Sequence, residues 1–276
     1  IGVLQAKVIN TLKLKLGKDM KIFFCPPDYF LSKDTQYIRG MRRYLDKNVK
    51  ILWSGPQIFT PGITSKMVAA ASRVTKSDQL IWWDNYPVND CEHPANTFHL
   101  GAFNAPFPTV SKKLAGILIN PMREPYANLI AIDTFAQYLR HPQRYDRRQA
   151  GLRAWKRWFG KNWTAWERIY TSFENINIAD NTPQGYLAKI LYARSMQEVS
   201  VVANAIGQDL EVIANALPDQ IPIAQQFCRA TESIRNRAFL FIKIVEACMQ
   251  KQSMVWPFLK FDRFPVLLLP EHQFFG

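Results

Sequence analysis

The first half of the chain repeats one pattern, a short apolar run followed by an amphipathic stretch, at a spacing of roughly thirty residues that is typical of βαβ units. The apolar runs are too short and too continuous for amphipathic helices, so we expect strands that are buried on both faces. These predicted strands are Ile22–Phe24, Ile51–Trp53, Leu80–Trp83 and Gly116–Ile119. Strands that alternate with helices at this period predict an α/β fold with a parallel sheet.

Two of the intervening stretches have apolar residues at helical spacing, and we predict helices over Asp34–Lys47 and Ile63–Lys76. Because Ser, Thr and Asp are favoured N-caps, the first helix is expected to begin at Ser32 or Asp34 and the second at Thr64 or Ser65.

Helical periodicity dominates after Asn120, and no further strand repeat follows. We predict helices over Arg123–Leu139, Leu187–Ala216 and Ile223–Met249, and an irregular tail over Val255–Gly276. The chain therefore divides into a predicted sheet-containing domain over residues 1–148 and a predicted helical bundle with its tail over residues 149–276.

The net charge of +13 raises nucleic-acid binding as a hypothesis. The basic residues are spread along the chain, with clusters at Lys13–Lys21 and Arg140–Arg157 that are typical of solvated helix faces. We therefore expect no nucleic-acid partner, although a basic helical module that binds nucleic acid or an acidic protein stays open as an alternative.

Membrane insertion is not expected either, because no apolar run reaches about eighteen residues. The four cysteines are widely spaced, which excludes a disulfide framework and favours a reducing compartment such as the cytoplasm. Asp90, Cys91, His93 and His99 match no standard metal-ligand spacing, so we expect no metal site.

Polar and aromatic side chains follow each predicted strand. Cys25 and Tyr29 follow the first, Ser54 the second, Asp84–Asp90 the third, and Asn120 the fourth. Because the carboxyl ends of parallel strands line the ligand crevice, these side chains are expected at one rim. Amides and carboxylates can bracket hydroxyl groups while aromatic faces cover a sugar ring, which is consistent with a sugar or polyol pocket.

Three strings carry a family resemblance: Ile51-Leu-Trp-Ser-Gly-Pro56, Ile81-Trp-Trp-Asp-Asn-Tyr-Pro-Val-Asn-Asp90 and Gly116-Ile-Leu-Ile-Asn-Pro-Met122. Their order and spacing resemble glycoside hydrolase family 84, which contains O-GlcNAcases and bacterial β-N-acetylglucosaminidases. The resemblance covers roughly residues 3 to 155. It implies the C-terminal half of a (β/α)8 TIM barrel followed by an α-helical bundle, acting without a cofactor.

The resemblance also implies substrate-assisted retaining hydrolysis of β-linked N-acetylglucosamine, in which the acetamido oxygen attacks the anomeric carbon and gives an oxazoline. The family's catalytic Asp pair precedes the Cys-Pro-x-x-Tyr segment by a few dozen residues. We therefore expect it upstream of Ile1, so that this chain holds no catalytic residue and is inactive alone.

The implied substrate contacts are seven. Asp90 is expected to accept hydrogen bonds from the 4- and 6-hydroxyls, Asn120 to contact ring hydroxyls, and Asn85 to lie beside the acetamido group. The pocket for the N-acetyl methyl group is expected to be walled by Cys25, Tyr29, Ser54 and Trp83, with the Tyr29 hydroxyl near the oxazoline. The expected partner is a glycoconjugate that contains N-acetylglucosamine.

The open sheet edge and a group of four tryptophans carry two further expectations. Because half a barrel leaves open sheet edges, the chain is expected to form homo-oligomers through such an edge. Trp155, Trp158, Trp163 and Trp166 resemble a carbohydrate-stacking platform, but their spacing is simpler to explain as a helix packing face. A non-catalytic or degenerate sugar-binding relative stays open as the alternative to an enzyme.

Overall fold

The computed structural model describes residues 1–17, 19–30, 32–60, 62–90, 98–173 and 185–216, with six single positions beyond them: Phe227, Arg235, Asn236, Ala238, Phe239 and Ile242. The predicted tail over Val255–Gly276 and most of the predicted helix Ile223–Met249 lie outside the described residues. The chain forms two compact units. The first comprises Ile1–Tyr86 and Asn104–Asn120, and the second comprises Pro87–Phe103 and Pro121–Gly276.

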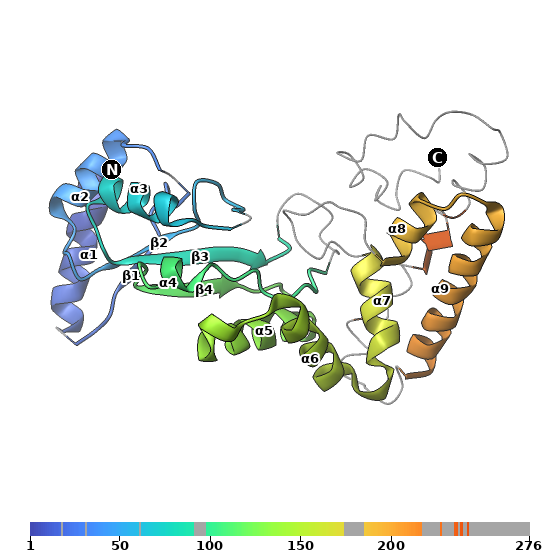
Figure 1. Ribbon diagram of the computed structural model, residues 1–276. Coiled ribbons are helices and arrows are strands. Elements are labelled where there is room, and N and C mark those ends of the chain that lie inside the picture. Colours follow the sequence, from blue (N-terminus) through green and yellow to red (C-terminus); the bar gives the residue numbers. More distant parts are fainter. Residues whose placement is uncertain are drawn as a thin grey trace, which may run out of the picture. The chain divides into compact units, whose positions relative to one another are not determined.

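The first unit is built on a four-stranded parallel sheet (Figure 1). Its strands are β1 (Phe23–Phe24), β2 (Lys50–Trp53), β3 (Leu80–Pro87) and β4 (Gly116–Asn120), and they lie in the order β1-β2-β3-β4. The register aligns Phe23 with Lys50 and Ile51 with Leu80. Parallel neighbours that follow one another in the chain, each joined through a helical connection, are the repeating unit of a (β/α) barrel.

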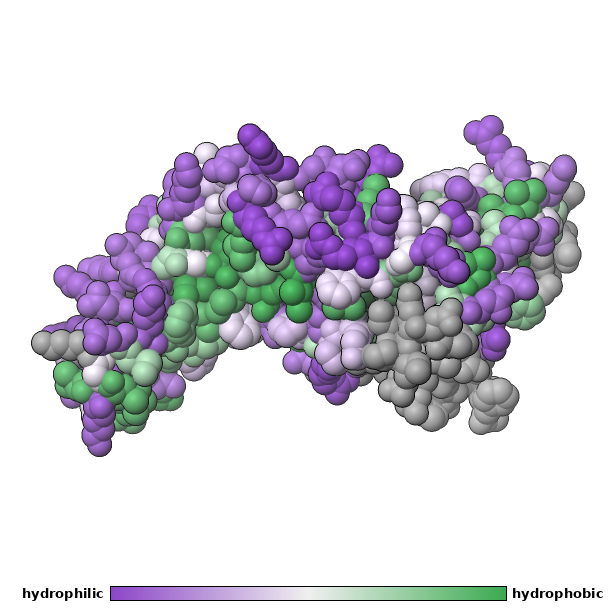
Figure 2. Space-filling view, turned by 90° about the horizontal axis from the view of Figure 1, so that it is seen from below, coloured by the Kyte–Doolittle hydropathy of each residue, from purple (hydrophilic) through white to green (hydrophobic). Residues whose placement is uncertain are grey.

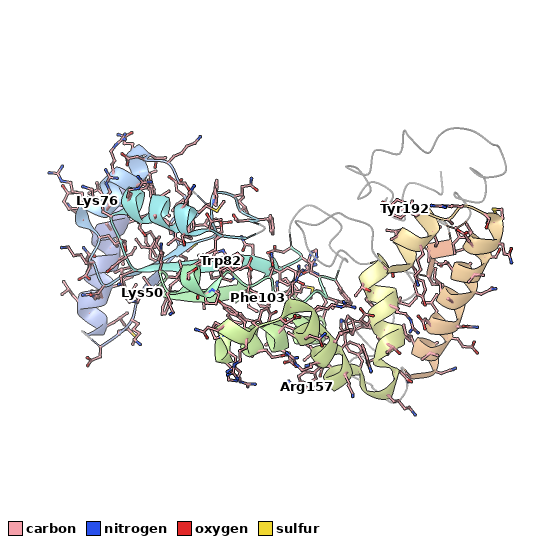
Figure 3. All side chains as sticks on the ribbon, in the orientation of Figure 1. Lys50, Lys76, Trp82, Phe103, Arg157 and Tyr192 are labelled. Carbon is pink, nitrogen blue, oxygen red and sulfur yellow. The ribbon has the colours of Figure 1, made fainter. Side chains whose placement is uncertain are left out.

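The helices of this unit are α1 (Gly2–Leu16), α2 (Gln36–Tyr44), α3 (Ser65–Thr75) and α4 (Pro108–Ser111). Thr64 caps α3 as predicted, because its hydroxyl accepts from the backbone N–H of Met67. The predicted cap of α2 is wrong: the cap is Thr35, whose hydroxyl accepts from the Ile38 N–H at 3.1 Å. The α3 helix ends at Thr75 and is followed by Lys76, a C-cap residue in the left-handed conformation that is labelled in Figure 3.

The core of this unit forms where the apolar stripes of the helices and the strands are buried. Ile38 and Met41 of α2 are buried, as are Val68 and Ala71 of α3. Each large apolar side chain so buried contributes roughly 1.5–3 kcal/mol. Gly2 packs against the backbone of α2, where a Cβ would meet the Tyr37 carbonyl oxygen, so glycine allows α1 and α2 to approach closely.

The strands differ from the sequence prediction in two respects. β3 continues beyond Trp83 to Pro87, so Asp84 and Asn85 belong to the strand and not to a loop. The inner strands β2 and β3 are buried almost throughout, but β1 and β4 are largely half-buried or exposed. The prediction of burial on both faces is wrong for those two, because each is at an edge of the sheet and has a neighbouring strand on one side only.

From Pro121 onward, the described part of the second unit is mostly helical. Its α-helices are α5 (Leu129–Arg140), α6 (Arg147–Phe159), α7 (Trp163–Phe173), α8 (Gly185–Leu191) and α9 (Met196–Ala216), with 3-10 turns at Pro125–Asn128, Pro142–Arg144 and Gly160–Asn162. The predicted helix Leu187–Ala216 is therefore two helices, α8 and α9. None of the described helices combines the length and the apolar character that a bilayer span requires.

The core of the second unit is aromatic. Trp155 and Trp166 are buried and flank Phe159, with ring centroids 4.8 and 4.9 Å from it. Trp163 packs against this cluster, and only Trp158 is substantially exposed among the four tryptophans. Three of the four thus form a packing surface, as their spacing predicts. The predicted domain boundary between residues 148 and 149 stays a prediction.

Candidate functional site

Tyr29 and Ser54 are brought together at the carboxyl ends of β1 and β2. The Ser54 backbone N–H donates a 2.9 Å hydrogen bond to the Tyr29 carbonyl. Tyr29 is held in turn by its own N–H, which donates to Pro26 at 3.0 Å, and by an edge contact of its ring with Phe30. The Ser54 hydroxyl is buried and donates to the Gln57 carbonyl at 2.7 Å. Both residues are therefore fixed through main-chain contacts.

Gly55 allows the chain to turn immediately after Ser54. Its φ is 109°, and a Cβ at this position would lie 2.3 Å from the Thr60 hydroxyl oxygen. Thr60 in turn donates to the Gln57 carbonyl at 3.0 Å and accepts from the Gln57 N–H. Because only glycine adopts this backbone conformation without strain and leaves this space, Gly55 shapes the loop that presents Ser54.

Asn85 is the centre of the predicted sugar-contact residues in the first unit. Its Oδ1 accepts from Trp83 Nε1 at 2.6 Å and from Asn120 Nδ2 at 3.2 Å. Its Nδ2 donates to the Ile58 carbonyl at 2.8 Å, and no described residue accepts the second Nδ2 proton. Buried amides are normally fully bonded, so one donor held ready at the end of the sheet is suited to an oxygen of a ligand.

Cys25 lies immediately after β1, where its side chain is exposed. The surrounding protein desolvates the thiol enough to raise its pKa, so it stays protonated at neutral pH. A protonated thiol is a weak nucleophile, and the part of Cys25 in a pocket wall stays a prediction.

Asp84 is a feature that the sequence did not single out. It is buried in β3 between Trp83 and Asn85, and this burial raises the pKa of its carboxyl to about 8. Successive strand residues project to opposite faces, so Asp84 projects away from the face that carries Trp83 and Asn85. Because burial favours the neutral acid, Asp84 is largely protonated at neutral pH.

Asp90 belongs to the second unit, three residues beyond the end of β3, and its side chain is exposed. The preceding Asn89 is buried and donates from Nδ2 to Glu124 Oε2 at 2.9 Å. Sequence reasoning missed this pair, because 35 residues separate its members. Six of the seven predicted residues lie in the first unit, where hydrogen bonds join Tyr29 to Ser54, and Trp83 and Asn120 to Asn85. Asp90 belongs to the second unit and is described separately.

A metal centre finds no support in the part of the chain that the structure describes, where no three His, Cys, Asp or Glu side chains gather in a way that could hold an ion. His99 is buried there, and its backbone N–H donates to the sulfur of Met122. Cys91 and His93 lie outside the described residues.

Comparisons with known proteins agree on one family. A family model described as NAGidase, β-N-acetylglucosaminidase, matches residues 2–172. The Rattus norvegicus and Mus musculus proteins named Protein O-GlcNAcase are each 27% identical over 140 residues, which is 49% of this chain and 15% of the relative. The chain thus spans only a small part of the curated relatives it matches.

Two solved structures share the fold. A mutant of the O-GlcNAc hydrolase of Thermobaculum terrenum superposes with a TM-score of 0.72 and 21% identity, covering 93% of this chain and 57% of that one. The structure of CpGH84B also gives a TM-score of 0.72, with 18% identity, 97% of this chain and 51% of that one. The predicted α/β fold class, part of a barrel followed by helices, is confirmed by these likenesses.

Proposed function

Because the chain belongs to the β-N-acetylglucosaminidase family, we propose that it forms the sugar-binding part of a retaining glycosidase that removes β-linked N-acetylglucosamine from a glycoconjugate. The observation that carries this proposal is the position of Asn85. Three hydrogen bonds orient its amide at the carboxyl end of the sheet, and its second N–H, which no described residue accepts, is proposed to donate to a ligand. The family resemblance predicts the acetamido group of the substrate there.

The other residues of the first unit supply walls and hydroxyl contacts. Ser54 and Tyr29 are joined through the main chain, and Trp83 presents a half-exposed indole on the same strand face as Asn85. With Cys25 these side chains enclose the N-acetyl methyl group, and an uncharged thiol suits such an apolar neighbour. The half-buried Asn120 amide contacts ring hydroxyls, and the Tyr29 hydroxyl lies near the oxazoline.

Asp90 completes the recognition of the sugar by accepting hydrogen bonds from its 4- and 6-hydroxyls. Its exposed carboxylate offers two strong acceptor oxygens to two neighbouring hydroxyls. Such charge-assisted hydrogen bonds contribute about 1.5–3 kcal/mol each, so this residue makes a large share of the binding.

The chemical step follows the substrate-assisted route. The acetamido oxygen attacks the anomeric carbon, one carboxylate of an Asp pair polarises the acetamido group, and the other protonates the leaving oxygen and then activates water. No cofactor or metal takes part. No two Asp residues are adjacent in residues 1–276, so the proposal includes that a chain of these residues alone is inactive.

The test uses the full-length protein with aryl β-N-acetylglucosaminide and aryl β-glucoside substrates. Hydrolysis of the first only is expected, because the second lacks the internal nucleophile, and NMR should detect the β-anomer of the product first. Comparable hydrolysis of the glucoside, or the α-anomer as first product, contradicts the mechanism. Binding of N-acetylglucosamine without any hydrolysis identifies the non-catalytic relative instead.

Residue roles are tested by substitution in the same protein. Asn85→Ala is expected to lower kcat/KM roughly 10- to 100-fold, because it removes a positioned donor together with its hydrogen bond to the Ile58 carbonyl. Glu211→Ala, an exposed position on α9, serves as the control and should leave kcat/KM unchanged. Unchanged kinetics for Asn85→Ala contradict the proposed site.

A further inference from the structure

Asn128, in the second unit, fixes the backbone of the loop that comes after β4 in the chain. Its Oδ1 accepts from the Met122 N–H at 2.7 Å, while its Nδ2 donates to the carbonyls of Met122 and Glu124, both at 2.9 Å. The side chain is 3% exposed. Asn128 stands at the N-cap of α5 but makes no cap hydrogen bond with its side chain, since the amide is used on the preceding loop.

Glu124, held by this contact, reaches the segment that follows β3. Its Oε2 accepts from Asn89 Nδ2 at 2.9 Å, and Asn89 is 3% exposed. A hydrogen bond to a carboxylate is stronger than one between neutral groups, and a buried amide that loses such a partner is costly. The contact therefore restrains the Asn89 backbone, and Asp90 is the next residue along the chain.

We propose that Glu124 is a positioning residue for Asp90, acting through Asn89, with Asn128 holding the Glu124 loop in place. The inference rests on the proposed function, in which the Asp90 carboxylate contacts the 4- and 6-hydroxyls of the sugar. An exposed carboxylate has many accessible orientations, whereas binding groups must be held within about 0.5 Å of their productive geometry. Restraint of the adjacent buried residue narrows those orientations before the sugar arrives, which lowers the entropic cost of binding.

A purely structural role for Glu124 predicts something different. In that case its loss weakens the fold and lowers kcat/KM by the same factor whether or not Asp90 is present. A positioning role requires that the effect of Glu124 on catalysis depends on the Asp90 carboxylate and on the sugar hydroxyls that it contacts. This dependence is the measurable difference between a positioning role and a purely structural role.

The experiment is a double-mutant cycle in the full-length protein, with kcat/KM measured on an aryl β-N-acetylglucosaminide. Glu124→Ala is expected to lower kcat/KM about tenfold, and Asp90→Ala by more. In the Asp90→Ala background, Glu124→Ala is expected to cost less than twofold. With a substrate that lacks the 4- and 6-hydroxyls, Glu124→Ala is likewise expected to have little effect.

The controls separate folding from positioning. Glu124→Gln keeps a side-chain oxygen that can accept from Asn89, and it should retain kcat/KM within about threefold. If Glu124→Ala fails to fold, Asn89→Ala takes its place in the double-mutant cycle. The same dependence on Asp90 is then expected. Glu211→Ala, with an exposed carboxylate on α9, should match the unaltered protein throughout.

The outcomes distinguish this inference from the proposed function. If Asp90→Ala lowers kcat/KM severely but Glu124→Ala costs the same factor with and without Asp90, the positioning role is wrong and the proposed function stands. The positioning role is also wrong if Glu124→Ala folds and keeps full kcat/KM. If Asp90→Ala itself leaves kcat/KM unchanged, the assigned sugar contact is wrong and the inference that depends on it fails with it.

Discussion

The indole Nε1 of Trp83 donates a 2.6 Å hydrogen bond to Oδ1 of Asn85, two residues further along β3. Alternate residues of a strand project from the same face, so the strand itself brings the two side chains together. Asn120 on the neighbouring β4 donates to the same oxygen. The orientation of the Asn85 amide therefore depends on two strands, and it is set before any ligand binds.

The first prediction concerns the Trp83 N–H. Trp83→Phe keeps an aromatic ring but removes the donor, so the Asn85 amide loses one of its three hydrogen bonds. We expect kcat/KM of the full-length protein to fall about fivefold, which corresponds to the roughly 1 kcal/mol contributed by one hydrogen bond. Steady-state kinetics on an aryl β-N-acetylglucosaminide measure this change.

Trp53→Phe is the matched control. Trp53 is buried in β2, and its Nε1 has no hydrogen-bond partner among the described residues, so the same substitution removes no hydrogen bond. It should leave kcat/KM within about twofold of the unaltered protein. Equal losses for the two variants would show that ring volume, and not the N–H of Trp83, matters.

The second prediction concerns pH and Asp84. Its carboxyl has a folded-state pKa of about 8, raised by burial, against about 3.9 in an unfolded chain. Between these values the folded state binds more protons than the unfolded state, so the free energy of unfolding decreases as pH rises. The stabilisation is complete below about pH 4 and lost as pH passes about 8.

Denaturant unfolding between pH 5 and 9 checks this sign. Asp84→Asn has nearly the same shape and does not ionise, so we expect it to flatten the decline of stability toward alkaline pH. Asp78→Asn, at an exposed position two residues before β3, should keep the decline. If the stability of Asp84→Asn declines as steeply as that of the unaltered protein, groups other than Asp84 cause the decline.

The strand and helix repeat could be predicted from the sequence because its cause is local. Ile51–Trp53 and Leu80–Trp83 are continuous apolar runs that only an inner strand buries on both faces. The placement of Ser54, Asn85 and Asn120 at the ends of adjacent strands follows from the same repeat together with the parallel topology.

The remaining features depend on contacts between distant residues. The length of β3 could not be predicted, because Asp84 and Asn85 are polar and continue a strand only where burial and cross-strand partners accommodate them. The Asn89–Glu124 contact and the hydrogen bonds of Asn128 join loops without periodicity. No local sequence pattern predicts such pairs.

The third prediction concerns the loop after β2. Gly55→Ala places a methyl group against the Thr60 side chain at a φ of 109°, so both steric overlap and backbone strain oppose it. We expect the free energy of unfolding to fall by more than about 1–3 kcal/mol, which is the cost of strain alone. The kcat/KM should fall as well, because Gly55 shapes the loop that presents Ser54.

Gly160→Ala provides the comparison for the third prediction. Gly160 also has a positive φ, 61°, but a Cβ there meets no atom within 4 Å, so only strain opposes the substitution. Thermal or urea unfolding should therefore rank Gly55→Ala as clearly more destabilising. Equal destabilisation would show that the Thr60 side chain moves away from the added methyl group at no cost in the free energy of unfolding.

The fourth prediction concerns the apolar surface of α1. Leu4, Val8 and Leu12 recur every fourth residue and are 66%, 51% and 49% exposed, and Phe23 of the edge strand β1 is 52% exposed. Figure 2 shows apolar side chains gathered into patches on one face of the molecule. Exposed apolar side chains on a helix and on an edge strand promote association, so residues 1–276 produced alone are expected to form oligomers.

Sedimentation velocity measures that association. Replacing Leu4, Val8 and Leu12 together by Gln removes the apolar stripe and keeps residues with good helix propensity, so the triple variant should shift toward the monomer. Val201→Gln on α9 removes an equally exposed apolar side chain, 62%, from the second unit and should leave the oligomer unchanged. If the chain sediments as a monomer before any substitution, association through α1 and β1 is wrong. If the triple variant remains oligomeric, the association uses a different surface, and Phe23→Lys on β1 then tests the open sheet edge by itself.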